Sequence, residues 1–563
     1  MSRGSRAVLL VVAVLGLVAA GCGSSEDGSS GTTQPRGAQG STVGLDDAKA
    51  QPGGSLAFGM EADSDGFDPA ANRWAISGTM VALAVYDTLA AYDAEGNAQP
   101  YLAKSFSHDA AGTVWTIELR EGVQFSNGTP LTADAVKQVL DAMRASGLVG
   151  PAVRPITDVS VAGPLTVKVT MSSPWFAFPT VLTSQVGVVP EPSTLVKPAD
   201  GGASPAAANP IGTGPFIQTE WLPSAQWKGK RNPNYWRKDA DGVQLPYLEN
   251  ITFRPIVEST QRVSALESGD VQMIHTDDPP AIEKLRQQTA EGKWRMVEDA
   301  GEGEEQFVMF NVTKAPVDDV NIRRALVHAV DVEDYVQVTA NGLFDAASSP
   351  FREGSTWYAP TPSYPAYDPG KAKQLVDEYK AAHGGAAPSI TLGLGGTDTL
   401  LAAQGQYLEQ QWEAAGFDVK VDAQEQSVFI TNAVTGNYQV QVFRQFGSPD
   451  PDFDYLWWTS QNATGPITLN IARNQSACVD AAIKQGREQE DQAQRKDAYA
   501  KLAGCFADEV PYLWLYHVVW AVVADLKVHN ISNGPLPDGR PSIPLAAGDF
   551  GGVVRLTNTW IEH

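Results

Sequence analysis

The spacing of apolar positions predicts a chain of mixed strands and helices from about residue 53 onward. Apolar and polar residues alternate in 114–120 and 165–171, which is typical of half-buried strands. After Thr132, apolar residues recur at helical spacing; Thr132 suits a helix N-cap, and Asp134 places an acid in the first turn. Further helices are predicted at 78–89, 259–267, 319–330, 369–382, 401–415 and 480–506, and further strands at 55–60, 307–311, 389–393, 418–421 and 439–443.

From about residue 305, predicted strands and helices follow one another in turn. Such an order indicates an α/β unit with a largely parallel sheet. The body of about 510 residues is too long for one simple core, so two or three structural units are expected. No short tandem repeat is visible.

The first residues have the pattern of an export signal. Arg3 and Arg6 precede an apolar stretch, 7–20, which is shorter than the ~20 residues that a membrane-spanning helix needs. The order Val-Ala-Ala-Gly-Cys at 18–22 resembles the cleavage box of bacterial lipoproteins, with Ala19 where leucine is usual. This resemblance implies that Cys22 is acylated and becomes the new N-terminus. An ordinary secretory signal with a chance cysteine is the alternative.

The segment behind Cys22 is rich in glycine, serine and other small polar residues. Such a chain has almost nothing to bury, so 22–52 is predicted to be a flexible tether with a root-mean-square span of ~30 Å. Two or more acyl chains would make the attachment to the membrane stable, whereas one would be marginal. The tether would therefore keep the folded body close to a membrane partner.

Charge and cysteine content narrow the possible functions. The formal net charge is −24, which disfavours nucleic-acid binding, and solubility is the simplest reason for the acidity. Only Cys22, Cys478 and Cys505 occur. With Cys22 acylated, an even pair remains in an oxidising compartment, and a Cys478–Cys505 disulfide is predicted to contribute about 3 kcal/mol. Two buried free thiols are the alternative.

Motifs for catalysis are missing from the sequence. It contains no HExxH, no GxSxG, no GxxxxGK[ST] and no CxxC pattern, so no enzyme activity, no cofactor and no metal site are predicted. The fourteen tryptophans are a generous number. Several stand beside turns, where aromatic side chains either complete the core or line a concave site for a small ligand.

An ordered series of short motifs resembles the family 5 extracellular solute-binding proteins of ABC importers, the oligopeptide, dipeptide and nickel group. The match begins with YDTL at 86–89 and continues through GTVWTIELR at 112–120 and GVQFSNGTPLTAD at 122–134. The later members are GTGPF at 212–216, RNPNYW at 231–236, ALESGD at 265–270, FN at 310–311, IRRA at 322–325, YDPGKA at 367–372 and DPD at 450–452. The resemblance covers about 53–545.

This resemblance implies two α/β lobes of the type II periplasmic-binding-protein fold, joined by a hinge, with an extra subdomain in the first lobe. Ligand would be trapped as the lobes close. The expected boundaries are a signal peptide at 1–21, a tether at 22–52, lobe I at 53–85, 205–300 and 522–563, the inserted subdomain at 86–204, and lobe II at 301–521. The second hinge strand would lie near 516–523.

The resemblance also guides the choice of ligand contacts. In peptide-binding relatives an acidic residue just before the Asp-Pro-Asp loop pairs with the ligand's α-amino group, and Gly447 stands at that position here. Asp450, Asp452 or Asp454 could substitute, although capping the following turn is their simpler role. The predicted cleft contacts are Arg73, Trp74, Arg444, Phe446, Trp457 and His517.

Two classes of function remain open. The first is a monomeric, lipid-anchored receptor that delivers oligopeptides, or another solute such as a nickel chelate, sugar or opine, to an ABC permease with its ATPase. The second is a secreted enzyme or sensor on the same scaffold, since a fold does not fix a function. Neighbouring permease and ATPase genes would favour the first.

Overall fold

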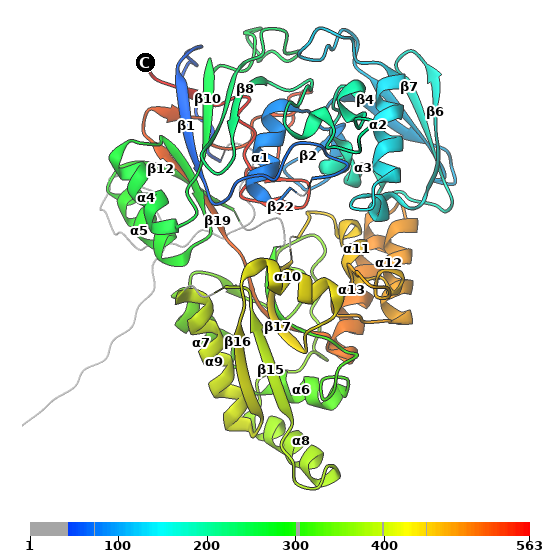
Figure 1. The fold of residues 1–563 in the computed structure, drawn as a ribbon, viewed down its shortest axis with the longest axis vertical. Helices are drawn as coiled ribbons and strands as arrows, with labels where there is room; N and C mark the ends of the chain where they lie inside the picture. Colours follow the sequence, from blue (N-terminus) through cyan, green and yellow to red (C-terminus); the bar gives the residue numbers. More distant parts are fainter. Residues whose placement is uncertain (1–42, 73, 300–303, 397–398, 446) are drawn as a thin grey trace, which may run out of the picture. The chain divides into compact units, whose positions relative to one another are not determined.

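The computed structural model describes residues 43–72, 74–299, 304–396, 399–445 and 447–563. Cys22, Arg73 and Phe446 therefore lie outside the described residues. Two large sheets organise the chain (Figure 1). No helix among the described residues is both long and apolar enough to cross a membrane.

The first sheet has seven strands in the order β12-β19-β11-β1-β10-β9-β8. Its central strands, β1, β10 and β11, run parallel, whereas the strands on either side are antiparallel. The strands are β1 (Ser55–Met60), β8 (Phe216–Leu222), β9 (Gln226–Arg231), β10 (Asn250–Pro255), β11 (Met273–Thr276), β12 (Trp294–Asp299) and β19 (Trp520–Asp525). Helices α1 (Ile76–Val85), α4 (Ser259–Ser268) and α5 (Pro279–Ala290) contact this sheet.

The second sheet has six strands in the order β14-β18-β13-β17-β15-β16. The strands are β13 (Glu305–Phe310), β14 (Asp345–Ala346), β15 (Ser389–Leu394), β16 (Asp418–Ala423), β17 (Val440–Gln445) and β18 (Tyr512–His517). The prediction of a largely parallel sheet is wrong. Only β15 pairs in parallel, with β16 and β17, while β13 is antiparallel to both of its neighbours. Helical periodicity between strands found the βα units but gave no sign of these antiparallel pairings.

Helices complete the second unit. They are α6 (Val320–His328), α7 (Val332–Ala340), α8 (Pro369–Ala382), α9 (Thr399–Ala415), α10 (Gln426–Thr435), α11 (Tyr455–Trp458), α12 (Ala477–Glu488) and α13 (Gln492–Glu509). The single helix predicted at 480–506 is two helices. The break occurs where the Asp491 side chain accepts a hydrogen bond from the backbone nitrogen of Gln494 and caps α13. A Cys478–Cys505 disulfide, as predicted, joins the two helices, with the Cα atoms 5.9 Å apart.

A third, four-stranded antiparallel sheet lies within 103–171, in the order β4-β5-β7-β6. Its elements are β4 (Ala103–His108), β5 (Val114–Leu119), β6 (Ile156–Gly163), β7 (Thr166–Met171) and the covering helix α2 (Ala133–Ala145). The predicted cap is confirmed, because Thr132 Oγ1 accepts a hydrogen bond from the Ala135 backbone nitrogen at 3.2 Å. Short elements flank this segment or lie near the end of the chain: β2 (Ala90–Tyr92), β3 (Ala98–Pro100), α3 (Phe178–Val181), β20 (Val528–His529), β21 (Ala546–Ala547), β22 (Phe550–Gly551) and β23 (Trp560–Ile561).

Two glycines allow the turn before β8 to pack closely against the end of α1. A Cβ on Gly212 or Gly214 would lie within 2.5 Å of the Val85 carbonyl oxygen, at the end of α1. Since no side chain fits in that space, the turn before β8 requires glycine at both positions. The motif GTGPF is therefore part of the scaffold.

The two large sheets are linked by a very short chain segment between β18 and β19. Strand β18 ends at His517 in the second sheet, and β19 begins at Trp520 in the first, so only Val518 and Val519 separate them. Both valines are buried. In Figure 1 the chain passes from one sheet to the other at this point.

Candidate functional site

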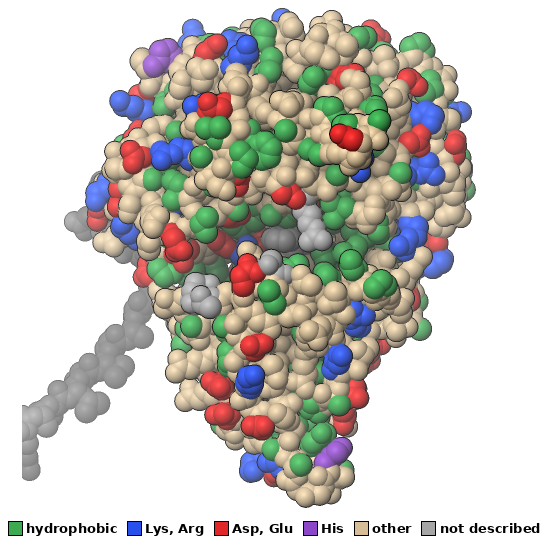
Figure 2. Space-filling view, in the orientation of Figure 1, with side chains coloured by type: hydrophobic (Ala, Val, Ile, Leu, Met, Phe, Trp, Pro, Cys, Tyr) green, Lys and Arg blue, Asp and Glu red, His purple; other side chains and the backbone are tan. Residues whose placement is uncertain are grey.

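Acidic side chains gather where strands of the first sheet end. Strands β1 and β11 are parallel neighbours, with Phe58 opposite Met273, so their carboxyl ends lie at the same edge. Glu61 follows β1 and Asp277 follows β11. The edge beyond the carboxyl ends of parallel strands is where α/β proteins bind ligands. Figure 2 shows a hollow on this face of the molecule, bordered by hydrophobic and acidic side chains.

Arg444 joins this edge to the second sheet. It lies near the end of β17, forms an ion pair with Asp277, and has Nε 2.6 Å from Glu304 Oε1. Its guanidinium group also lies 5.6 Å from the centre of the Trp520 ring. Trp520 in turn donates a hydrogen bond from Nε1 to Glu304 Oε2 at 2.7 Å. We name Glu61, Asp277, Glu304 and Arg444 the Arg444 cluster; it connects residues next to both sheets.

The Arg444 cluster contains three carboxyl groups and one guanidinium group. Burial, and next the charge of Asp277, raise the pKa of Glu61 to about 8. Burial also acts to raise the pKa of Asp277, but the charge and hydrogen bond of Arg444, with other favourable contacts, bring that pKa below its usual value. In this cluster, therefore, Glu61 keeps its proton at neutral pH, whereas Asp277 is ionised.

His275 supports Glu61 as a neutral imidazole. Its Nε2 accepts a hydrogen bond from the Glu61 backbone nitrogen at 3.3 Å, and its Nδ1 donates to the Gly552 carbonyl oxygen at 3.3 Å. Burial, and next the charge of Arg262, lower the pKa of His275 to about 3. An imidazolium would lose the first of these bonds, so the geometry and the pKa agree.

The raised pKa of Glu61 predicts a pH-dependent stability. Because the folded state holds this proton more tightly than the unfolded chain, the free energy of unfolding should fall as the pH rises from about 4.5 to about 8. At pH 9, Glu61→Gln should therefore be more stable than the wild type, on the order of 2–4 kcal/mol. Urea unfolding at several pH values measures this. The two proteins should converge below pH 4.5, and a pH-independent difference would contradict the assignment to Glu61.

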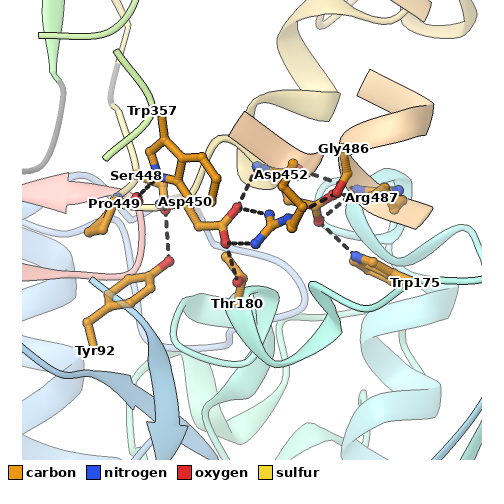
Figure 3. Close-up of polar contacts among 11 residues, drawn as sticks. Tyr92, Trp175, Thr180, Trp357, Ser448, Pro449, Asp450, Asp452, Gly486 and Arg487 are labelled. Atoms are coloured by element: carbon orange, nitrogen blue, oxygen red, sulfur yellow. Dashed lines mark hydrogen bonds and ion pairs between the residues drawn. The ribbon is translucent and has the colours of Figure 1, made fainter. Parts of the chain in front are cut away.

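The aspartates of the Asp-Pro-Asp loop contact the segment between β7 and β8 (Figure 3). Asp450 forms a two-point ion pair with Arg495, at 2.6 and 2.9 Å, and accepts a hydrogen bond from Thr180 at 3.4 Å. It also caps the turn at Pro451–Asp454, as predicted, by accepting from the Asp452 backbone nitrogen at 3.0 Å. Its carboxyl oxygens are therefore occupied by the protein.

Asp452 is held in the same way. It pairs with Arg487 at 2.8 and 3.1 Å and accepts a hydrogen bond from Trp175 Nε1 at 2.7 Å. The Arg487 guanidinium group lies 4.4 Å from the Trp175 ring and 3.9 Å from the Tyr455 ring. Neither Asp450 nor Asp452 is placed to take over the role of the acid that peptide-binding relatives have at the position of Gly447. Both join the second unit to the inserted segment.

The predicted ligand contacts lie in different surroundings. Arg444 belongs to the cluster above. Trp74 is 6% exposed, stacks on Tyr86 and donates from Nε1 to the Gly66 carbonyl oxygen at 3.0 Å, a set of contacts typical of a core residue. Trp457 is half-buried in α11 and packs against the core around Trp458. His517 is buried at the end of β18. Ligand contact by these residues, and by Arg73 and Phe446, stays a prediction.

Sequence reasoning missed Glu61, Asp277 and Glu304. The available signal was their position in the sequence: Glu61 directly follows β1, Asp277 directly follows β11, and Glu304 directly precedes β13. Among the described residues, no group of three or more His, Cys, Asp and Glu side chains has the geometry to hold a metal ion.

Comparisons with known proteins agree with this architecture. Residues 97–466 match the bacterial extracellular solute-binding proteins, family 5 Middle. The nickel-binding periplasmic protein of Escherichia coli K12 is 25% identical over 474 residues, covering 81% of this chain and 88% of that protein. The glutathione-binding protein GsiB of Pectobacterium atrosepticum is 26% identical over 453 residues, covering 77% of this chain and 83% of that protein.

A solved structure shows the same fold. The periplasmic binding protein DppA from Helicobacter pylori, in complex with the peptide STSA, superposes with a TM-score of 0.75 at 21% identity, covering 91% of this chain and 99% of that one. The fold is thus that of the two-lobed periplasmic binding proteins. The chain belongs to family 5 of the bacterial extracellular solute-binding proteins, which bind small ligands or peptides outside the cytoplasm and deliver them to an ABC permease. Its relatives are binding proteins, not enzymes.

Proposed function

We propose that this protein is a lipid-anchored receptor that captures a peptide or a similar small solute between its two lobes. The observation that carries the proposal is the Arg444 cluster, in which side chains next to the strand ends of both sheets meet around one guanidinium group. Ion pairs that form only when two lobes approach favour the closed state, and a ligand that contacts both lobes adds to that preference.

We propose that the lobes turn about the segments that join the sheets. Lobe I would comprise 53–85, 205–300 and 522–563, the inserted subdomain 86–204, and lobe II 301–521. The short Val518–Val519 connection supports a hinge there. Hinge motions are absorbed by changes in the backbone angles of a few residues at the ends of secondary-structure elements.

Ligand screening tests the capture of a solute. The body from about Gly53 would be unfolded and refolded to remove carried ligand, then screened by thermal shift against peptides of two to eight residues, sugars, opines, glutathione and nickel chelates. A ligand at 100 times its Kd should add about 2.7 kcal/mol of stability. Small-angle X-ray scattering should show a smaller radius of gyration with the ligand. No shift with any class would contradict the proposal.

The ligands of the relatives suggest which other ligands this protein could bind. Those relatives are described as binding nickel, glutathione or a peptide. A shift by one non-peptide class alone would replace the peptide in the proposal and leave the receptor role in place. Gly447 would then be the informative departure from peptide-binding relatives.

Fractionation tests the lipid anchor. Full-length protein expressed in a bacterial host should sediment with membranes, whereas Cys22→Ser should appear in the soluble extracytoplasmic or culture fraction. A chain with an uncleaved signal peptide would still sediment, so the mass of the N-terminal peptide is the second readout. An unacylated, membrane-free wild type would contradict the anchor and favour an ordinary secretory signal.

A further inference from the structure

A second set of carboxyl groups lies at the end of the second sheet, apart from the Arg444 cluster. Glu305 is the first residue of β13 and is 2% exposed. Across the sheet it is opposite Gln445 of β17, whose Nε2 donates a hydrogen bond to Asp454 Oδ1 at 2.8 Å. Asp454 is 5% exposed. Burial, and next the charge of Asp454, raise the pKa of Glu305 well above its usual value.

A third carboxyl group approaches from the other unit. Asp549 lies in the turn between β21 and β22, and the next residues fix that hairpin to the first sheet. The Gly552 carbonyl oxygen accepts the hydrogen bond of His275 in β11. The charge of Asp549 contributes, after burial, to the raised pKa of Asp454. We name Glu305, Asp454 and Asp549 the carboxyl cluster: Glu305 and Asp454 are linked through Gln445, and Asp549 acts on Asp454 through its charge.

The described lysines, arginines and histidines do not neutralise the carboxyl cluster. Among the described residues, no lysine, arginine or histidine forms an ion pair with any of its three members. The nearby arginines pair with other acids: Arg352 with Asp345, Arg444 with Asp277 and Glu304, Arg487 with Asp452, and Arg495 with Asp450. Two buried carboxyl groups and a half-buried one, unpaired with any described cation, are costly unless they hold protons or a positive group enters.

An independent sign of a missing partner is His517. It stands directly opposite Glu305 in the β13–β18 pairing, so both side chains lie on the same face of the sheet. His517 is 3% exposed, yet its Nδ1 has no hydrogen-bond partner among the described residues. Burial, and next the charge of Arg352, lower the pKa of His517 to about 3, so the ring is neutral and offers a nitrogen to accept a hydrogen bond.

We propose that Glu305, Asp454, Asp549 and His517 form a subsite for a protonated amine or a guanidinium group of the ligand. The inference rests on the proposed function and specifies its substrate class. An ammonium group carries three donors and no acceptor, so it can donate to as many as three of these four acceptor groups at once. Because Asp549 comes from one unit and Glu305 and Asp454 from the other, a cation held by all three would bind the closed state most tightly.

The subsite differs from a pairing with one acid at the position of Gly447. That position has no side chain here, while the carboxyl cluster draws on β13, the turn after Asp450 and the β21–β22 hairpin. In the empty state, burial raises the pKa of Asp549 to about 7 and also raises those of Glu305 and Asp454. A cation should therefore displace protons when it binds.

Matched charged and neutral probes test the inference on refolded protein. The cationic probes are tri-alanine, whose neutral counterpart is N-acetyl-tri-alanine amide, and putrescine and agmatine, which share 1,4-butanediol as their neutral counterpart; nickel chloride is a separate probe. At least one cationic probe should raise the melting temperature and its neutral counterpart should not. Calorimetry in two buffers of different ionisation enthalpy should detect proton release at pH 6.

Variants then assign the effect to residues. Glu305→Gln and Asp549→Asn should each raise the Kd of the cationic probe at least tenfold. Gln and Asn keep the size of the side chains they replace. The matched control is Asp418→Asn, an exposed carboxyl at the start of β16, which should leave the Kd unchanged. Circular dichroism and the melting temperature without probe verify folding of each variant.

The outcomes separate the two proposals. Neutral probes that bind as tightly as cationic ones, or binding unchanged in both variants, would overturn the subsite and leave the receptor role intact. Binding of nickel chloride alone would also overturn it in favour of a metal ligand. If no probe binds, the subsite is overturned, and the receptor role fails only if the wider library of peptides, sugars, opines and chelates also gives no shift.

Discussion

Arg487→Met will lower the free energy of unfolding by about 3–5 kcal/mol, because it leaves the buried Asp452 carboxylate without its cation. Arg487 is 5% exposed and Asp452 is 2% exposed. The substitution also removes the guanidinium group that lies between the Trp175 and Tyr455 rings. Urea or thermal unfolding followed by tryptophan fluorescence measures the loss.

Two further variants make the Arg487 prediction specific. Lys484→Met removes an exposed ion pair with Glu488 on the same helix, α12, and should cost no more than about 0.5 kcal/mol. Adding Asp452→Asn to Arg487→Met should recover part of the loss, because the uncompensated charge is then gone. Equal effects of Arg487→Met and Lys484→Met would show that the pair contributes little.

Arg444→Met will have the largest effect on lobe closure. The substitution leaves Asp277, Glu304 and Glu61 close together without the guanidinium group that joins them across the two units. Truncating one partner of a partly buried charge pair costs about 2–5 kcal/mol, which corresponds to a Kd raised at least about thirtyfold for a ligand held in the closed state. Scattering should show a larger radius of gyration in the ligand-free variant at pH 8.

The loss in Arg444→Met should shrink in acid. Without Arg444, the pKa values of the remaining carboxyl groups rise above those of the unfolded chain, so their penalty is present above those pKa values and disappears as the pH falls. Closure should therefore recover near pH 5. Arg295→Met is the matched control. Arg295 lies in β12, forms an ion pair with Asp46 at 3.2 Å, and has a side chain that is 35% exposed. An unchanged radius of gyration in Arg444→Met at pH 8 would contradict the role of the cluster.

Local patterns predicted most of the elements. Alternation found β5 and β7, helical spacing found α8 and α9, and Thr132 marked the start of α2. These succeed because period and capping depend on neighbours in sequence. The prediction failed at 480–506, where the capping carboxylate of Asp491 divides a continuous helical pattern into α12 and α13. It failed again for the second sheet, because strand direction depends on pairings between distant segments.

The candidate site was only partly accessible from the sequence. Arg444 was chosen for its place at the end of a predicted strand, and it does lie where the two units meet. Glu61, Asp277 and Glu304 belong to no motif, and nothing local distinguishes them from the many exposed acids of this chain. Their role depends on burial and on one shared cation, and both arise from contacts between residues far apart in the sequence.

The sequence by itself determined the family, the α/β character, the disulfide pair and the positions of most strands and helices. These follow from short motifs, composition and periodicity. Only the tertiary structure decided which strands pair, that Asp450 and Asp452 hold the inserted segment, and which acids meet Arg444. The physical reason is that charge in a protein acts through space and through burial, and both are set by how the sheets come together.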